Sequence, residues 1–373
     1  MKQRNHAFDL LCGICIIRMI MLHITNSCGF GKEDWWTPIM QWSYYFMSFF
    51  FFKAGYFNKT VAGNSKEFCK KKFKQLLVPY FVWGTIGNIV YFFFVWFILD
   101  PNNALCKQVE LKHIWESSQF YGNIPCWFLF SFFIAYITAH FIAKVPPLFR
   151  IPIPKPLIWN PNRSVINFKI HWFTLGFPFI SYWLWTKDNP LWFGLDNVFI
   201  GIYLFYLGRL WHYTQERLGR QNAIIFSCMM IVFFILFNAG IGGSYTMVDN
   251  IWVGNPVMTV INITLALCGL SGILLNINLP RIPVLGYIGQ HSMVFFVAHY
   301  PIMMFYKMVR SANVRTLRGH WDDYTILTFM IFTICFLLVP YVEKVPWLSG
   351  RFNGEKTLPN LFIKKEKENP ATL

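Results

Sequence analysis

The chain has 373 residues, of which 55% are hydrophobic, 20% aromatic and only 13% charged, with a mean hydropathy of +0.40. Soluble domains carry about 25% charged residues, so this composition excludes an ordinary soluble enzyme and predicts an integral membrane protein. The net charge of +16 lies mainly in short clusters beside apolar segments, whereas a nucleic-acid-binding protein needs an extended basic face. We therefore expect the lipid bilayer, and no nucleic acid, as a partner.

Apolar segments long enough to cross a bilayer, about 17 to 25 residues each, recur along the whole chain. The predicted fold is all-α, a polytopic integral membrane protein of about ten transmembrane helices. The fifth segment is the least apolar, because Pro178 interrupts it and polar residues begin it. The ten predicted spans are 8–27, 38–57, 76–99, 123–143, 169–186, 192–212, 222–241, 257–277, 284–307 and 323–343.

Lysine and arginine are distributed unevenly between alternate loops, as expected when cytoplasmic loops carry the positive excess. With the N-terminus inside, the inner loops and tails hold 23 of the 33 Lys and Arg residues and the outer loops hold eight. Both termini are therefore predicted to be cytoplasmic, in the cell's inner (cytoplasmic) membrane. Half of the outer eight lie between 307 and 318, so either this loop binds an acidic group or the last two spans are misplaced. We expect a membrane domain at 1–345 and a basic tail at 346–373.

Ionisable side chains within predicted spans are costly and are functional hypotheses by default. Asp9 and His23 are 14 residues apart, which places them within about 40° on one helix face and about 21 Å apart along the axis. Arg18 points about 140° away from His23, so we expect it to face another helix or a phosphate. Lys53 has apolar neighbours on both sides, which argues against a lysine that merely reaches the interface. A core histidine bonded to a carbonyl remains the alternative for His23.

The cysteines and the basic cluster leave alternatives open. Cys28 and Cys106 both lie on the predicted outer side, where they either pair or stay reduced, and most of the other seven fall within spans as small apolar residues. The KKKFKQ cluster at 70–75 either only orients the protein or binds anionic headgroups or a phosphorylated substrate. We find no phosphate-binding glycine loop, nucleophile elbow or HExxH helix, and we expect no metal.

Five stretches, in chain order, combine these polar residues with glycines and aromatic residues. They are FDLLCGICIIRMIMLHIT at 8–25, FFFFKAGYFNKT at 49–60, CKKKFKQLLVPYFVW at 69–83, CWFLFSFF at 126–133 and LGYIGQHSMVFFVAHYPIM at 285–303. On ten predicted helices with both ends inside, this series resembles the membrane acyltransferase family called acyltransferase 3.

The resemblance implies an O-acyltransferase that moves an acyl group, most often acetyl, from acyl-CoA to a hydroxyl of a glycan or a lipid-linked sugar. It implies that His23 is catalytic, and an unperturbed pKa of about 6.5 suits a histidine to act as general base. Asp9 is the second catalytic candidate, as an anchor for the base or for a lysine. The candidates for substrate binding are Arg18, Lys53, Lys71, Lys72, Lys74, Trp127, Ser292 and His299.

The sequence departs from the family pattern at two positions. Cys12 stands where the family often has an arginine, and Gln75 where a second arginine is usual. Lysine cannot replace the bidentate contact that arginine makes with phosphate, but Lys53 could supply the positive charge missing at Cys12. The alternative from another class is a transporter or flippase of lipid-linked glycans, which would use the same polar residues without covalent chemistry. A homo-oligomer is compatible with the sequence.

Overall fold

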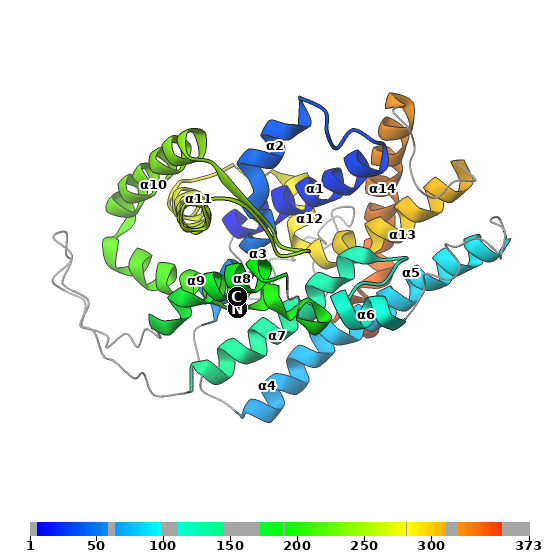
Figure 1. Ribbon diagram of the computed structural model, residues 1–373, viewed down its shortest axis with the longest axis horizontal. Coiled ribbons are helices and arrows are strands. Elements are labelled where there is room, and N and C mark those ends of the chain that lie inside the picture. The colour runs from blue at the N-terminus through cyan, green and yellow to red at the C-terminus, as the bar shows by residue number, and fades with distance from the viewer. Residues whose placement is uncertain are drawn as a thin grey trace, which may run out of the picture.

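The structure is a computed structural model that describes residues 6–58, 64–97, 111–144, 172–188, 191–280, 282–310 and 320–352. Within these ranges the chain folds almost entirely into helices, with one short β-hairpin (Figure 1). The predicted all-α polytopic membrane fold is confirmed, whereas the count of ten spans stays a prediction. In the described ranges, seven helical segments are long and apolar enough to cross a membrane: His6–Ser27, Ser65–Phe93, Ile124–Ile142, Arg220–Gly240, Pro256–Asn276, Ser292–Arg310 and Trp321–Val342.

Most helices follow the apolar segments from which they were predicted. The helical segment that contains the third predicted span begins earlier than expected, at Ser65, because a short helix and a π-helical turn lead directly into the spanning helix. The elements within predicted spans are α1 (His6–Ser27), α5 (Val78–Phe97), η4 (Ile124–Cys126), α7 (Trp127–Ile142), α10 (Arg220–Gly240), α11 (Pro256–Asn276) and α14 (Trp321–Val342). The elements before or between the spans, or after the last one, are α4 (Ser65–Lys72), η2 (Phe73–Leu77), α6 (Leu111–Ser117) and α15 (Pro346–Ser349).

Two predicted spans are broken in the middle. Span 38–57 divides into α2 (Trp36–Ser43), the turn η1 (Tyr44–Phe46) and α3 (Ser48–Phe57). Span 284–307 divides at His291 into α12 (Pro283–Gln290) and α13 (Ser292–Arg310). Uniform apolarity concealed both breaks, because a bent pair of short helices and one straight helix bury similar residues.

Two further predicted spans are helical but are not among the seven long apolar segments. Span 169–186 begins outside the described residues, and its described part is a turn, η5 (Trp172–Gly176), followed by α8 (Phe177–Thr186). Pro178 lies in the first turn of α8, where the missing N–H costs no helical hydrogen bond. Span 192–212 forms η6 (Trp192–Asn197) and α9 (Val198–Leu218).

Glycines allow two pairs of helices to approach backbone to backbone. A Cβ at Gly55 of α3 or at Gly208 of α9 would overlap a carbonyl oxygen of the other helix. The same relation joins α1 to α12, where Gly289 faces the backbone of Asp9 and Gly13 faces that of Leu285. Small residues at helix contacts are typical of membrane bundles, where close van der Waals packing replaces the hydrophobic effect.

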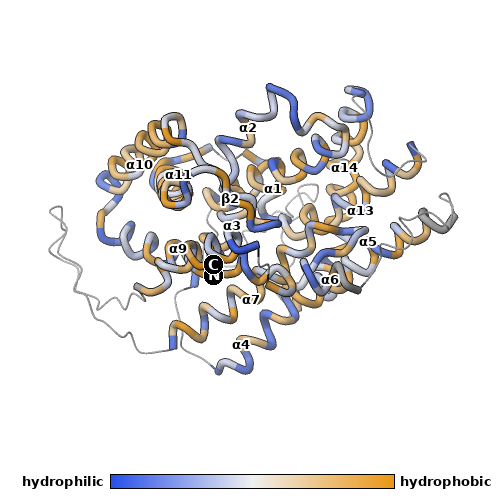
Figure 2. The backbone as a smooth tube through the Cα atoms, viewed as in Figure 1, coloured by the Kyte–Doolittle hydropathy of each residue, from blue (hydrophilic) through white to orange (hydrophobic). Residues whose placement is uncertain are grey.

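The outer surface of the bundle is apolar. Ile225 and Leu236 of α10 and Phe329 and Leu337 of α14 are exposed, as expected of side chains that face lipid. Figure 2 shows long apolar stretches on the helices and hydrophilic residues gathered in α4 and near helix ends. A bilayer therefore fits around the flanks of the bundle.

Contacts join segments that the charge count assigns to the same side of the membrane. On the predicted inner side, Ser65 Oγ is 3.2 Å from His140 Nε2, and Trp83 Nε1 donates to the Leu348 carbonyl over 2.9 Å. Helix α15, which belongs to the predicted tail, thus packs against α5. On the predicted outer side, Arg310 Nε pairs with Asp323 over 3.0 Å, so one cation of the basic outer loop is neutralised within the chain.

Candidate active site

A cavity of about 770 Å³ lies inside the bundle, on the side predicted to face outward. The C-terminal half of α1 forms one wall, α2 and η1 the second, and the start of α7 with Phe296 of α13 the third. The β-hairpin forms the fourth wall, and Gln119 reaches in from the segment before η4. Of the residues predicted to be functional, the structure brings Arg18, His23 and Trp127 together on this cavity.

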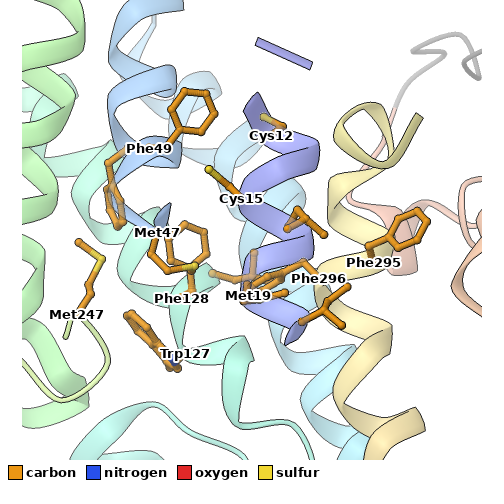
Figure 3. Close-up of a cluster of buried hydrophobic side chains, with 14 of the residues drawn as sticks. Cys12, Cys15, Met19, Met47, Phe49, Trp127, Phe128, Met247, Phe295 and Phe296 are labelled. Atoms are coloured by element: carbon orange, nitrogen blue, oxygen red, sulfur yellow. The ribbon is translucent and has the colours of Figure 1, made fainter. Parts of the chain in front are cut away.

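Apolar and aromatic side chains make up much of the cavity surface. Met19, Met47, Trp127, Met247 and Phe296 all line it. Figure 3 shows them gathered between α1, α3, α7, α13 and the hairpin. Such a largely apolar surface lowers the local dielectric and so strengthens electrostatic interactions at the cavity wall.

The hairpin wall was not predicted. Strands β1 (Gly243–Thr246) and β2 (Ile251–Gly254) pair antiparallel, with Thr246 opposite Ile251 across a four-residue turn. The sequence carried a signal for it in Gly242, in the glycines that begin β1 and end β2, and in Asn250, which the structure places at a positive φ of 51°. Asn is one of the few residues that tolerate this conformation.

Asn250 forms four hydrogen bonds, two to Ser181 of α8 and two to side chains of the hairpin strands. Its Oδ1 accepts from Ser181 Oγ over 2.6 Å, from Trp252 Nε1 over 3.1 Å and from Tyr245 OH over 3.2 Å. Its Nδ2 donates to the Ser181 carbonyl over 2.9 Å. Burial raises the pKa of the Tyr245 phenol above its ordinary value, so the hydroxyl keeps its proton and donates. The buried amide of Asn250 therefore joins both strands of the hairpin to α8.

His23 is half-buried on the cavity wall and packs against a second histidine. Its ring centroid is 5.2 Å from that of His299, and the ring edge meets Tyr300 at a centroid distance of 5.5 Å. His299 is fully buried, and its Nδ1 donates to the Phe296 carbonyl over 2.7 Å. This bond leaves the lone pair of neutral His299 on Nε2, which has no hydrogen-bond partner in the described part of the chain.

Arg18 borders the same cavity although it points away from His23 around the helix. Its guanidinium lies over the ring of Phe46, 4.1 Å from the centroid. Its Nε donates to Ser43 Oγ over 2.9 Å, and its Nη2 lies 2.7 Å from Met40 Sδ. Arg18 thus faces a different helix, α2, as predicted. Its side chain is long enough for the guanidinium to lie at the cavity wall.

Lys53 and Asp9 lie away from this cavity. Lys53 Nζ is 2.8 Å from Cys12 Sγ, so the ammonium does lie beside the thiol that replaces the family's arginine. Asp9 is buried in the first turn of α1, and the 14 residues to His23 correspond to about 21 Å of helix. Neither Lys53 nor Asp9 is among the residues that line the cavity.

The three predicted lysines lie at the other end of α7 from Trp127. Lys72 Nζ is 3.9 Å from the ring centroid of Tyr136, which is nine residues, or about 14 Å of helix, beyond Trp127. Lys74 Nζ is 5.3 Å from the ring centroid of Phe352, and Lys71 is exposed. Figure 1 shows α4, which carries Lys71 and Lys72, at the edge of the molecule opposite α2.

Ser292 does not line the cavity; it begins α13 beside a polar cluster that the sequence did not reveal. His291 Nδ1 is 2.5 Å from Glu343 Oε1, and Arg351 Nη1 is 2.8 Å from Glu343 Oε2. This cluster ties the break between α12 and α13 to the end of α14. Among the described residues no group of three or more metal-binding side chains is found, and Cys106, the predicted partner of Cys28, lies outside the described residues.

The family model for the acyltransferase 3 domain matches residues 5–340, nearly the whole chain. The chain belongs to the acyltransferase 3 family. No curated protein and no solved structure matches it. Membership of the acyltransferase 3 family makes this chain a multi-pass membrane acyltransferase and does not favour the alternative of a transporter without covalent chemistry.

Proposed function

We propose that this membrane acyltransferase transfers an acyl group, acetyl in the first instance, from acyl-CoA to a hydroxyl of a glycan or a lipid-linked sugar. The observation that supports this best is the place of His23 on the wall of a cavity that is largely apolar. A half-buried imidazole on the wall of such a cavity is suited to accept a proton from a bound hydroxyl. The ring of His299, which donates a hydrogen bond to the Phe296 carbonyl, packs against the ring of His23 and so helps to fix its position.

The proposed reaction is a direct transfer without a covalent enzyme intermediate. An unprotonated ring nitrogen of His23 takes the proton of the acceptor hydroxyl while the hydroxyl oxygen attacks the thioester carbonyl carbon. The carbon–sulfur bond then breaks, and His23 gives the proton to the leaving CoA sulfur. Gln119 and Ser244, which also line the cavity, offer amide and hydroxyl donors for the negative charge that develops on the carbonyl oxygen.

In the proposed reaction, the acyl donor and the acceptor reach the cavity from opposite sides of the membrane. Lys71, Lys72 and Lys74 lie on the side predicted to be cytoplasmic, where acyl-CoA is available, and their charges suit its phosphates. The long pantetheine arm would then carry the thioester along α7 toward the cavity. The hairpin and the segment carrying Gln119 lie on the predicted outer side, where a glycan or lipid-linked acceptor would enter.

The experiment is acyl transfer in membranes that contain the protein, incubated with labelled acetyl-CoA and a lipid extract and followed by mass measurement of products. His23→Ala should lower turnover by about 10² to 10⁴, the usual contribution of a general base, while binding of acetyl-CoA persists. His212→Ala is the matched control, because His212 contacts Glu216 on α9, away from the cavity. Near-normal turnover in His23→Ala would make His23 a structural histidine.

A further inference from the structure

The guanidinium of Arg18 lies in the cavity wall with one nitrogen left without a partner. The residue is only 8% exposed, and its Nε and Nη2 are occupied by Ser43 and Met40. Nη1 is buried and forms no hydrogen bond within the described part of the chain. Because Nε and Nη2 hold the guanidinium at the cavity wall, Nη1 is its remaining hydrogen-bond donor.

Arg18 also lacks a counter-ion among the described residues. Its neighbours are a hydroxyl, a thioether and the aromatic rings of Phe46 and Trp36, which cannot neutralise a full positive charge. Asp249 is the carboxylate among the residues that line the cavity, and its side chain is exposed. A buried cation without an anion is expensive in a protein interior and more so in a membrane, so Arg18 is suited to bind a negatively charged ligand.

We propose that the acceptor carries an anionic oxygen, of a carboxylate or a phosphate, and that Nη1 of Arg18 binds it. This inference rests on the function proposed above, in which His23 deprotonates the reacting hydroxyl. Arg18 and His23 are five residues apart on α1, about 7.5 Å along the axis, and border one cavity. The anion and the reacting hydroxyl are therefore separated by a distance comparable with one or two sugar units.

The anion belongs to the acceptor and not to the acyl donor. The phosphates of acyl-CoA have their own cations in Lys71, Lys72 and Lys74, beyond the far part of α7. The thioester end of the donor, which must reach His23, carries no negative charge. Arg18 therefore selects among acceptors, while the lysines bind the donor.

The test uses the purified full-length protein and three matched alkyl glycosides: an alkyl glucoside, the corresponding glucuronide and the corresponding glucose phosphate. Binding and acetylation from acetyl-CoA are measured for each. The wild-type protein should prefer at least one anionic glycoside over the neutral one by about 10- to 100-fold, the value of a hydrogen bond between charged groups. Preference for glucuronide identifies a carboxylate as the natural group, and preference for the phosphate identifies a phosphate.

Arg18→Met should remove this preference and leave binding of the neutral glycoside and of acetyl-CoA unchanged. Its thermal stability should equal or exceed that of the wild type, because the change replaces an unpaired charge by an apolar side chain. Lys187→Met is the matched control, since it removes a cation from the same predicted side at an exposed position outside the cavity. Equal binding of neutral and anionic glycosides by the wild type would overturn the proposal, as would an unchanged preference in Arg18→Met. An anionic preference in binding without acetylation would retain the anion site and reject the proposed reaction.

Discussion

Replacement of Asn250 by alanine tests how the cavity wall is held. The change removes three hydrogen bonds accepted by Oδ1 and one donated by Nδ2. Tyr245, Trp252 and Ser181 are all buried, so water cannot easily replace the lost partner. Each unsatisfied buried group costs about 1 to 3 kcal/mol, and the three together cost about 3 kcal/mol or more. Alanine also fits poorly at the positive φ of 51° that Asn250 adopts.

This loss exceeds what a two-stranded hairpin can recover by itself, so we expect the hairpin to open while the helices persist. Limited proteolysis from the predicted outer side should then cut within 243–254 in Asn250→Ala and not in the wild type. The Michaelis constant for the acceptor should rise at least tenfold, with acetyl-CoA binding unchanged. Ile251→Ala, an exposed change in the same hairpin outside the cavity, is the control. Normal protease resistance and a normal Michaelis constant in Asn250→Ala would refute this account of the wall.

Two further changes test the donor side and the topology. Lys53→Met should give a stable protein with weaker acyl-CoA binding or turnover. Lys53→Arg should recover only part of the loss, because a guanidinium needs more room beside Cys12 than an ammonium. Unchanged donor binding and turnover in Lys53→Met would make Lys53 a purely structural residue. Reporter fusions after Lys74 and Lys365 should be cytoplasmic and a fusion within 242–255 external, and an external C-terminus would mean an odd number of spans.

Long apolar segments predicted much of the fold because a bilayer leaves few alternatives. The segments at 222–241, 257–277 and 323–343 form α10, α11 and α14 with ends shifted by at most two residues. Asn255, whose side chain accepts from the backbone of the first turn of α11, and the proline that follows it mark a boundary that local chemistry alone can fix.

The breaks and the hairpin could not be read in the same way. Hydropathy does not distinguish a continuous span from α2, η1 and α3 in series, because all of them bury aromatic residues. The break at His291 depends on Glu343, 52 residues later in the chain, and no local pattern reports such a contact. The hairpin was treated as a loop because its strands have only four residues each.

Helical geometry predicted directions correctly but not the reach of side chains. The separation of Asp9 from His23 along one helix holds, and it keeps the two apart. The 140° between Arg18 and His23 also holds, yet both line one cavity because the long side chain of Arg18 reaches it. An angle between Cα positions therefore does not decide whether two long side chains share a site.

The two cations within predicted spans can be compared by what surrounds them. Each costs about 2.5 to 3.5 kcal/mol of insertion free energy at the centre of a membrane helix, and an apolar residue at the same position would not. Lys53 reaches the thiol of Cys12 in the same half of α1 as Asp9, and its charge fits the donor side of the proposed reaction. Arg18 reaches the cavity beside His23. If both charges serve anionic ligands, substrate binding should stabilise the protein more than its contact area alone would, because each ligand brings a negative charge to a cation inside the bundle.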